Sequence, residues 1–267
     1  MGRIVGAFAT SHILFPSRGV ETAAAEVFEG MMRLRAEVEA LDPDVLVVAS
    51  SDHMNNFTLA RQVALAVGVG ESFTPLGDMG IPTTGMRGQP DLAWRFARAA
   101  EGLGLVPVEE ASPDHGMALT RLIASPDPTL PVLPVWINSN MPLPPAPARA
   151  FALGEALRKA VEADIGASER IVVVAGGGLS HWLCTPEEGR INQAFDRRFL
   201  EMMCQGRFAE LAQIGVEELE REAGNGGLEL ASWLFAAGAV PGAGGEILYY
   251  QPIPEWITGM GGVALRP

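Results

Sequence analysis

Short apolar runs alternate along the chain with longer amphipathic stretches. Runs rich in β-branched residues are too short for helices and predict buried strands at residues 4–8, from 45 onward, and at 63–67, 105–108, 130–138 and 171–175. Prolines in the run at 130–138 indicate an edge or irregular position in the sheet. Helical spacing of apolar residues predicts helices at 21–41, 90–101, 117–123, 153–161, 186–206 and from about 229. This alternation predicts an α/β fold, with a mostly parallel central sheet flanked by helices.

The four histidines share one position relative to the predicted strands. His12, His53, His115 and His181 each follow an apolar run by a few residues. In open α/β sheets ligands bind beyond the carboxyl ends of the strands, so the four imidazoles are expected to converge on one site there. Any one of them, taken alone, is more often a hydrogen-bonded loop or core histidine. Their shared placement favours a common active site.

Histidines grouped in this way suit metal and acid-base chemistry. Two neutral imidazoles and one carboxylate form the facial triad of non-heme Fe(II), which leaves coordination positions open. The same ligand types also suit Zn²⁺ with an open water position, so a zinc-dependent hydrolase is an alternative. The remaining two histidines would be available for proton transfer near neutral pH.

The best candidate for the carboxylate ligand is Glu229. It lies in the first turn of an apolar predicted helix, directly after the glycine-rich segment 224–227. An acid at this place also stabilises a helix through the helix dipole, which is the alternative interpretation. Glu246, Asp52 and Asp114 are further candidates, and the last two suit a role in orienting a neighbouring imidazole.

Composition limits the kinds of partner. The 267 residues, 48% of them hydrophobic, are expected to form a single domain spanning residues 1–267. A net charge of −13 argues against a nucleic-acid partner, because phosphate binding needs clustered cations. Cys184 and Cys204 form no disulfide framework or CxxC pair. The most apolar later stretch, 228–240, is too short to span a membrane, and the N-terminal run lacks a signal-peptide cleavage pattern. We therefore expect a cytoplasmic protein with no membrane partner.

A long segment rich in glycine and proline, residues 68–89, interrupts the regular pattern. Irregular stretches of this length within a compact domain are usually functional or mobile. The segment is interpreted as a flap over the active site, with a plain surface loop as an equal alternative.

Five short motifs carry a family resemblance. They are Ser11-His12, Asp52-His53, Asp114-His115-Gly116, Gly177-Gly178-Leu179-Ser180-His181 and Leu228-Glu229. With them the chain resembles, nearly end to end, the class III extradiol ring-cleavage dioxygenases, the superfamily of the protocatechuate 4,5-dioxygenase β subunit and of 2,3-dihydroxyphenylpropionate 1,2-dioxygenase. Trp182-Leu183-Cys184 departs from the Gln and Pro often found after the last histidine, which concerns the substrate side of the pocket.

The resemblance implies a role for each site residue. His12, His53 and Glu229 would be the ligands of Fe(II), and His115 and His181 would be the acid-base pair. The expected reaction inserts O2 into a catechol-like aromatic diol, or a dihydroxypyridine or hydroxypyridone, and opens the ring. A homo-oligomer is expected, and a separate small α subunit is a further partner that the resemblance allows. The alternatives are a non-enzymatic binding protein similar to the Memo type and the zinc-dependent hydrolase.

Overall fold

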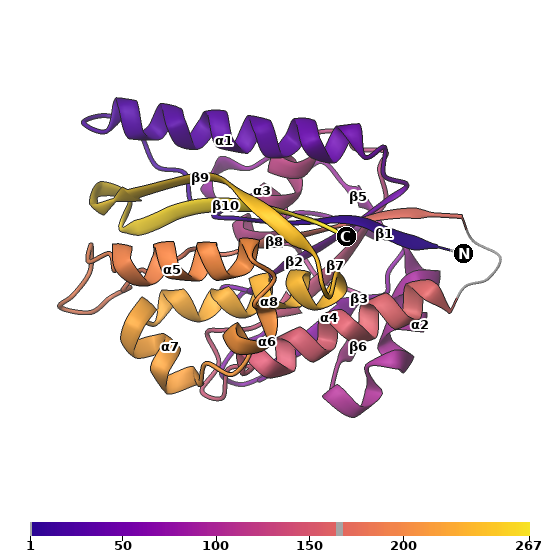
Figure 1. The fold of residues 1–267 in the computed structure, drawn as a ribbon. Coiled ribbons are helices and arrows are strands. Elements are labelled where there is room, and N and C mark those ends of the chain that lie inside the picture. The colour runs from indigo at the N-terminus through magenta and orange to yellow at the C-terminus, as the bar shows by residue number, and fades with distance from the viewer. Residues whose placement is uncertain (1, 164–167) are drawn as a thin grey trace.

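The computed structural model describes residues 2–163 and 168–267, and an eight-stranded sheet forms its centre (Figure 1). The strand order is β6-β3-β7-β2-β8-β1-β10-β9. The strands are β1 Arg3–Thr10, β2 Val45–Ser50, β3 Leu65–Gly68, β6 Val106–Val108, β7 Val132–Ile137, β8 Arg170–Gly176, β9 Gly244–Ile253 and β10 Thr258–Arg266.

Parallel pairing dominates the middle of the sheet. β2 pairs in parallel with both β7 and β8, and β8 pairs in parallel with β1. β6 and β3 are also parallel, whereas β3–β7, β1–β10 and β10–β9 are antiparallel. Strands buried on both faces need apolar side chains at successive positions, which is why β2 and β8 are continuous runs of Val, Leu, Ile and Ala. The predicted α/β class with a mostly parallel sheet is confirmed.

Helices cover both faces of the sheet (Figure 1). Successive strand residues point to opposite faces, so Val174 packs with α1 and α3, whereas Val173 packs in the core that contains α2, α4 and α8. Helices α5, α6 and α7 extend this second layer. The α-helices are α1 Glu21–Ala40, α2 Pro90–Ala99, α3 His115–Ala124, α4 Pro147–Glu162, α5 Gln193–Cys204, α6 Phe208–Leu211, α7 Val216–Ala223 and α8 Leu230–Ala239. Shorter 3₁₀ turns are η1 Asp78–Gly80, η2 Glu101–Leu103, η3 Gly226–Glu229 and η4 Pro254–Trp256.

The helix predicted from Pro186 begins later than expected. Gly189 adopts the left-handed φ of 86°, which breaks a right-handed helix before it can propagate. α5 starts at Gln193, where the side chain of Asn192 accepts a hydrogen bond from the Phe195 amide and caps the helix. The predicted start at Pro186 was therefore wrong.

Of the two positions predicted for the proline-containing strand, edge or irregular, the edge position was wrong. β7 lies inside the sheet, between β3 and β2. Its pairing with β3 covers Val135 to Ile137, so Pro134 lies just beyond that ladder. A missing amide hydrogen at that position leaves the β3 ladder complete, which explains how an interior strand tolerates proline.

The glycine- and proline-rich segment contains more regular structure than the sequence predicted. β4 Ser72–Phe73 and β5 Met86–Arg87 pair antiparallel in a small second sheet that closes the segment at its base. The turn η1 lies between them. Across the described part of the chain, no helix has the length and apolarity needed to cross a lipid bilayer.

Candidate active site

Neighbouring strands bring the predicted site residues to one edge of the sheet. β2, β8 and β1 lie side by side and parallel, and His53, His181 and His12 follow their carboxyl ends. His115 reaches the same region as the first residue of α3. The predicted reason was wrong for this histidine, because the preceding strand β6 runs opposite to β1, β2 and β8. Glu229 is the last residue of η3, directly before α8, rather than inside the first turn of a regular helix as predicted.

Four of these five residues form a tight cluster. Nε2 of His53 lies 3.0 Å from Oε1 of Glu229, and Nε2 of His12 lies 4.0 Å from Oε2 of the same carboxylate. One ring nitrogen from each of His12, His53 and His115 lies within 4.8 Å of the others. The predicted convergence of imidazoles and one acid is therefore present in the geometry, and His115 is as close to the cluster as the two predicted ligands.

His12 is the most deeply buried imidazole of the cluster. Its side chain is 1% exposed, and neither ring nitrogen has a hydrogen-bond partner among the described residues. Burial lowers the pKa of His12 to about 4, although the nearby Glu229 carboxylate opposes this shift. A neutral imidazole with unpaired buried nitrogens is a suitable donor for a metal ion.

Glu229 is a buried carboxylate held by several partners. Its Oε2 accepts a hydrogen bond of 2.9 Å from the amide of Gly178. Burial alone would raise its pKa, but His12 and His53 more than offset burial and hold the pKa well below the usual value. The side chain is therefore an anion that requires compensating positive charge.

His53 is held between two carboxylates. Oδ2 of Asp114 accepts from the backbone amide of His53 at 2.7 Å and contacts its Nδ1 at 3.0 Å. Burial lowers the pKa of His53, but hydrogen bonds to Asp114 and Glu229 outweigh burial and raise it. Asp114 thus has the predicted orienting role toward an imidazole, and it also caps α3 by accepting from the Met117 amide.

The other two acid candidates lie elsewhere. Asp52 accepts hydrogen bonds from the amides of Asn55, Asn56 and Phe57, so it stabilises the turn after His53, and no bond to an imidazole is found for it within the described residues. Glu246 is an exposed residue of β9 that forms ion pairs with Arg33 and Arg266. Neither can serve as the acid of the cluster.

His181 lies outside the three-histidine group. Its Nδ1 is 2.8 Å from the carbonyl oxygen of Leu179, which can only accept, so Nδ1 donates. Its proximity to Glu229 contributes to the lowered pKa of that acid. Gly226 packs against the opposite edge of the ring, where a Cβ would lie 2.0 Å from Nε2. Only glycine fits at this position beside His181.

A second glycine is required beside the two predicted ligands. A Cβ on Gly116 would lie 2.8 Å from a carbon of the His53 ring and 3.3 Å from one of His12. Each residue of the motif Asp114-His115-Gly116 therefore contributes to the site. Asp114 hydrogen-bonds to His53, His115 is a member of the cluster, and Gly116 lacks the side chain that would collide with the rings of His53 and His12.

One site residue was not predicted. Oδ2 of Asp78, in the turn η1, lies 2.6 Å from Nδ1 of His115. The only sequence signal was the irregular segment 68–89 itself, because nothing in the spacing links position 78 to position 115. This contact shows that the segment reaches the site, in agreement with the flap interpretation.

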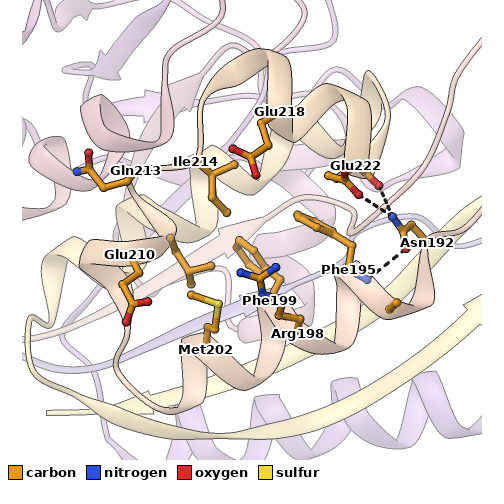
Figure 2. A pocket seen from close by; sticks show the side chains of 12 residues that line it. Asn192, Phe195, Arg198, Phe199, Met202, Glu210, Gln213, Ile214, Glu218 and Glu222 are labelled. Atoms are coloured by element: carbon orange, nitrogen blue, oxygen red, sulfur yellow. Dashed lines mark hydrogen bonds between the residues drawn. The ribbon is translucent and has the colours of Figure 1, made fainter.

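A separate cleft of about 540 Å³ lies between α5 and the segment that carries α6 and α7 (Figure 2). None of its lining residues belongs to the histidine cluster. The side chain of Asn192, which lines the cleft, accepts a hydrogen bond from the Phe195 amide and donates one to the carbonyl of Glu222, as Figure 2 shows. The backbone amide of Asn192 also donates to Oγ of Ser180, the residue before His181. The cleft is thus structurally connected to the loop that carries His181.

The donor set fits a divalent cation. The three-histidine group could hold a metal ion, and Glu229 adds a carboxylate that contacts two of its members. A cation among these groups would give His12 a partner and compensate the buried Glu229. Together, an α/β sheet and a cluster of imidazoles and carboxylates at the carboxyl ends of its strands define a metal-dependent enzyme of the α/β class.

Comparison with known proteins identifies the family. Residues 6–261 match the family described as the catalytic LigB subunit of aromatic ring-opening dioxygenase. The chain belongs to this family, the class III extradiol dioxygenases, and is an enzyme of the ring-cleavage dioxygenase class. The corresponding prediction from sequence is confirmed.

Several curated relatives share nearly the whole length of the chain. The 2,3-dihydroxyphenylpropionate/2,3-dihydroxicinnamic acid 1,2-dioxygenase of Klebsiella pneumoniae (strain 342) is 29% identical, over 86% of this chain and 88% of its own length. The enzyme of the same name from Paraburkholderia xenovorans is 29% identical over 94% and 95% of the two chains. The crystal structure of an uncharacterized protein, JW3007, from Escherichia coli K12 shares the fold, with a TM-score of 0.59, 19% identity and coverage of 97% and 99%.

Proposed function

We propose that this protein is an Fe(II)-dependent extradiol dioxygenase that opens the ring of a catechol-like substrate, with His12, His53 and Glu229 as iron ligands. The observation that supports this best is that both buried nitrogens of His12, beside the Glu229 carboxylate, have no hydrogen-bond partner within residues 2–163 and 168–267. Bound there, ferrous iron would supply coordination positions for the two oxygens of a diol and for O2.

Glu229 is preferred over His115 as the third ligand because of its charge. Its two oxygens face His53 and His12 separately, so it already spans the two imidazoles. A buried carboxylate is strongly destabilising without a cation, whereas a half-buried imidazole with a carboxylate partner is not. His115 is therefore assigned to proton transfer, although its nitrogen is as close to the cluster as those of the two histidine ligands.

The two remaining histidines are proposed to move protons. In each ring Nδ1 is held by an acceptor, Asp78 for His115 and the Leu179 carbonyl for His181. Nε2 of the neutral ring is then the nitrogen that accepts a proton from a substrate hydroxyl and returns it during ring opening.

The proposed substrate class is a small aromatic or heteroaromatic diol. The relatives are named for 2,3-dihydroxyphenylpropionate and 2,3-dihydroxicinnamic acid, which are catechols with a carboxylated side chain. A dihydroxypyridine or hydroxypyridone presents two adjacent oxygens in the same way. The product would be a ring-opened acid that contains both oxygen atoms of O2.

The test is metal analysis combined with oxygen uptake. Protein reconstituted anaerobically with Fe(II) or with Zn²⁺ is mixed with a panel of catechols and pyridinediols, and O2 is then admitted. The proposal expects a spectral change on diol binding, and stoichiometric O2 uptake with Fe(II) only. No uptake with any diol, or equal turnover with Zn²⁺, would contradict it.

The oligomeric state remains a prediction. Exposed apolar side chains on α1, Phe28 at 42% and Met32 at 55%, offer one face for contact between copies. Light scattering on the purified protein would show whether a homo-oligomer forms without a separate small subunit.

A further inference from the structure

Asp78 is carried by a turn with unusual backbone geometry. Gly77, Met79 and Gly80 all have left-handed φ values, of 81°, 52° and 75°. Left-handed backbone is costly for a residue with a side chain, so the conformation of Met79 needs support from surrounding contacts. Just before the turn, the amide of Leu76 donates to the carbonyl of Pro113 at 2.8 Å and fixes the segment near α3.

The contact between Asp78 and His115 is short and directional. Oδ2 lies 2.6 Å from Nδ1, and the two side chains are only 27% and 18% exposed. The other oxygen, Oδ1, is buried and has no hydrogen-bond partner among the described residues. Because a carboxylate only accepts, Nδ1 of His115 must carry the proton. Within the described part of the chain, His115 is thus the one hydrogen-bond partner of the Asp78 carboxylate.

The ring of His115 packs against the ring of His53, with the two planes tilted by 30°. Its ring centroid lies 4.2 Å from that of His53 and 5.8 Å from that of His12. Transfer of the ring proton from Nδ1 to Nε2 would replace an acceptor by a donor at Nε2, and a flip of the ring would put a carbon in place of that nitrogen. A group that prevents either change therefore determines whether Nε2 of His115 can accept a proton.

We infer that Asp78 is a positioning residue, which fixes the ring orientation and the Nδ1–H tautomer of His115 so that Nε2 is available to the substrate. The inference rests on the proposed function for the role of His115 in catalysis, whereas the tautomer itself does not depend on it.

Nδ1 of His181 has a different kind of acceptor from Nδ1 of His115. In His181 the acceptor for Nδ1 is the backbone carbonyl of Leu179, two residues away, which no side-chain substitution removes. The tautomer of His115 depends instead on one side chain from a separate segment, 37 positions away. The orientation of His115 is therefore linked to the docking of the segment between β4 and β5.

A spectroscopic experiment tests the tautomer independently of turnover. The ¹⁵N shifts of the histidine rings are recorded on Zn²⁺-loaded protein, about two pH units above the unperturbed histidine pKa. The His115 signals are assigned by comparison with a His115→Gln variant. We expect Nδ1 of His115 to carry the proton in the unmodified protein, and the Asp78→Ala variant to shift toward the Nε2–H form. An Nε2–H ring before substitution, or shifts unchanged in Asp78→Ala, would overturn the inference.

Kinetics on the Fe(II) protein test the consequence. Asp78→Ala should lower kcat by about 10–100-fold, the usual cost of losing a partner that orients a reactive imidazole, with iron content and KM little changed. Asp78→Asn keeps an acceptor oxygen and should recover part of the loss. Glu71→Gln removes an exposed acid directly before β4 and should behave as the unmodified protein.

Two kinetic outcomes would contradict the inference. Loss of iron in Asp78→Ala would show that the carboxylate supports metal binding. An unchanged kcat would show that the Asp78–His115 contact has no effect on catalysis. If the unmodified protein opens no diol, the proposed function fails, whereas the ¹⁵N shifts still decide the tautomer.

Discussion

Nε2 of His53 lies 3.0 Å from Oε1 of Glu229, although 176 positions separate the two residues in the chain. This contact joins the end of the central strand β2 to the start of α8. With His12 it forms the set to which we assign the iron.

Substitution of a ligand should remove the metal. Glu229→Ala and His53→Ala are each expected to lower iron affinity by more than the roughly 10–100-fold typical of removing an outer partner, because a direct donor is lost. Iron per protein after desalting is the measurement. Glu246→Ala is the matched control, since this acid pairs with Arg33 and Arg266 on the surface and should leave iron content unchanged. Full iron content and activity in Glu229→Ala would refute the assignment.

His181→Ala should separate metal binding from turnover. The ring hydrogen-bonds to Leu179 and lies outside the three-histidine group, so iron content should be retained. Activity should fall by about 10²–10⁴-fold, the range typical of a lost acid-base group. Steady-state O2 uptake and metal analysis on the same sample decide the point. Parallel loss of iron would show that His181 is a ligand.

A methyl group at Gly226 should displace the ring of His181. A Cβ there would lie 2.0 Å from Nε2, so the imidazole must move in Gly226→Ala. A shift of about 1 Å at a reacting group can cost up to about 10²-fold in rate, and we expect such a loss in kcat with iron retained. Gly102→Ala, where nothing lies within 4 Å of the new Cβ, serves as the control. Equal activity of the two variants would show that Nε2 of His181 is not used.

Asp196 should make stability depend on pH in mildly acidic solution. Burial raises its pKa from 3.8 to about 6, even though hydrogen bonds from Ser180 and Tyr250 oppose the shift. Since the folded protein then binds the proton more tightly than the unfolded chain, this contribution to stability is fully present below pH 3.8. It is lost as the pH rises through about 6, and it amounts to about 3 kcal/mol.

The measurement is chemical denaturation at several pH values with Asp196→Asn as the reference. The variant lacks the titrating group, so the stability of the unmodified protein relative to it should fall between pH 3.8 and about 6 and then stay level. A constant difference across this range would mean that Asp196 has the same pKa in the folded and unfolded states.

Local signals in the sequence were sufficient for the class of fold. Continuous β-branched runs such as β2 and β8 are needed only where a strand is buried on both faces, and they predicted the central parallel strands correctly. Element boundaries were less reliable. The start at Pro186 was wrong because Gly189 adopts a left-handed conformation, and the edge position of the proline strand was wrong because Pro134 lies just beyond its ladder with β3.

The sequence by itself determined that His12, His53 and His181 lie at one edge of the sheet, because each follows one of the parallel strands β1, β2 and β8. The tertiary structure was needed for His115, because the preceding strand β6 runs opposite to those three. The tertiary structure alone decided how those side chains pair. It placed Asp114 on His53, excluded Asp52 and Glu246 from the cluster, and brought Asp78 to His115. Such pairings depend on how loops fold back across the edge of the sheet, and loop geometry leaves no periodic signal in the order of residues.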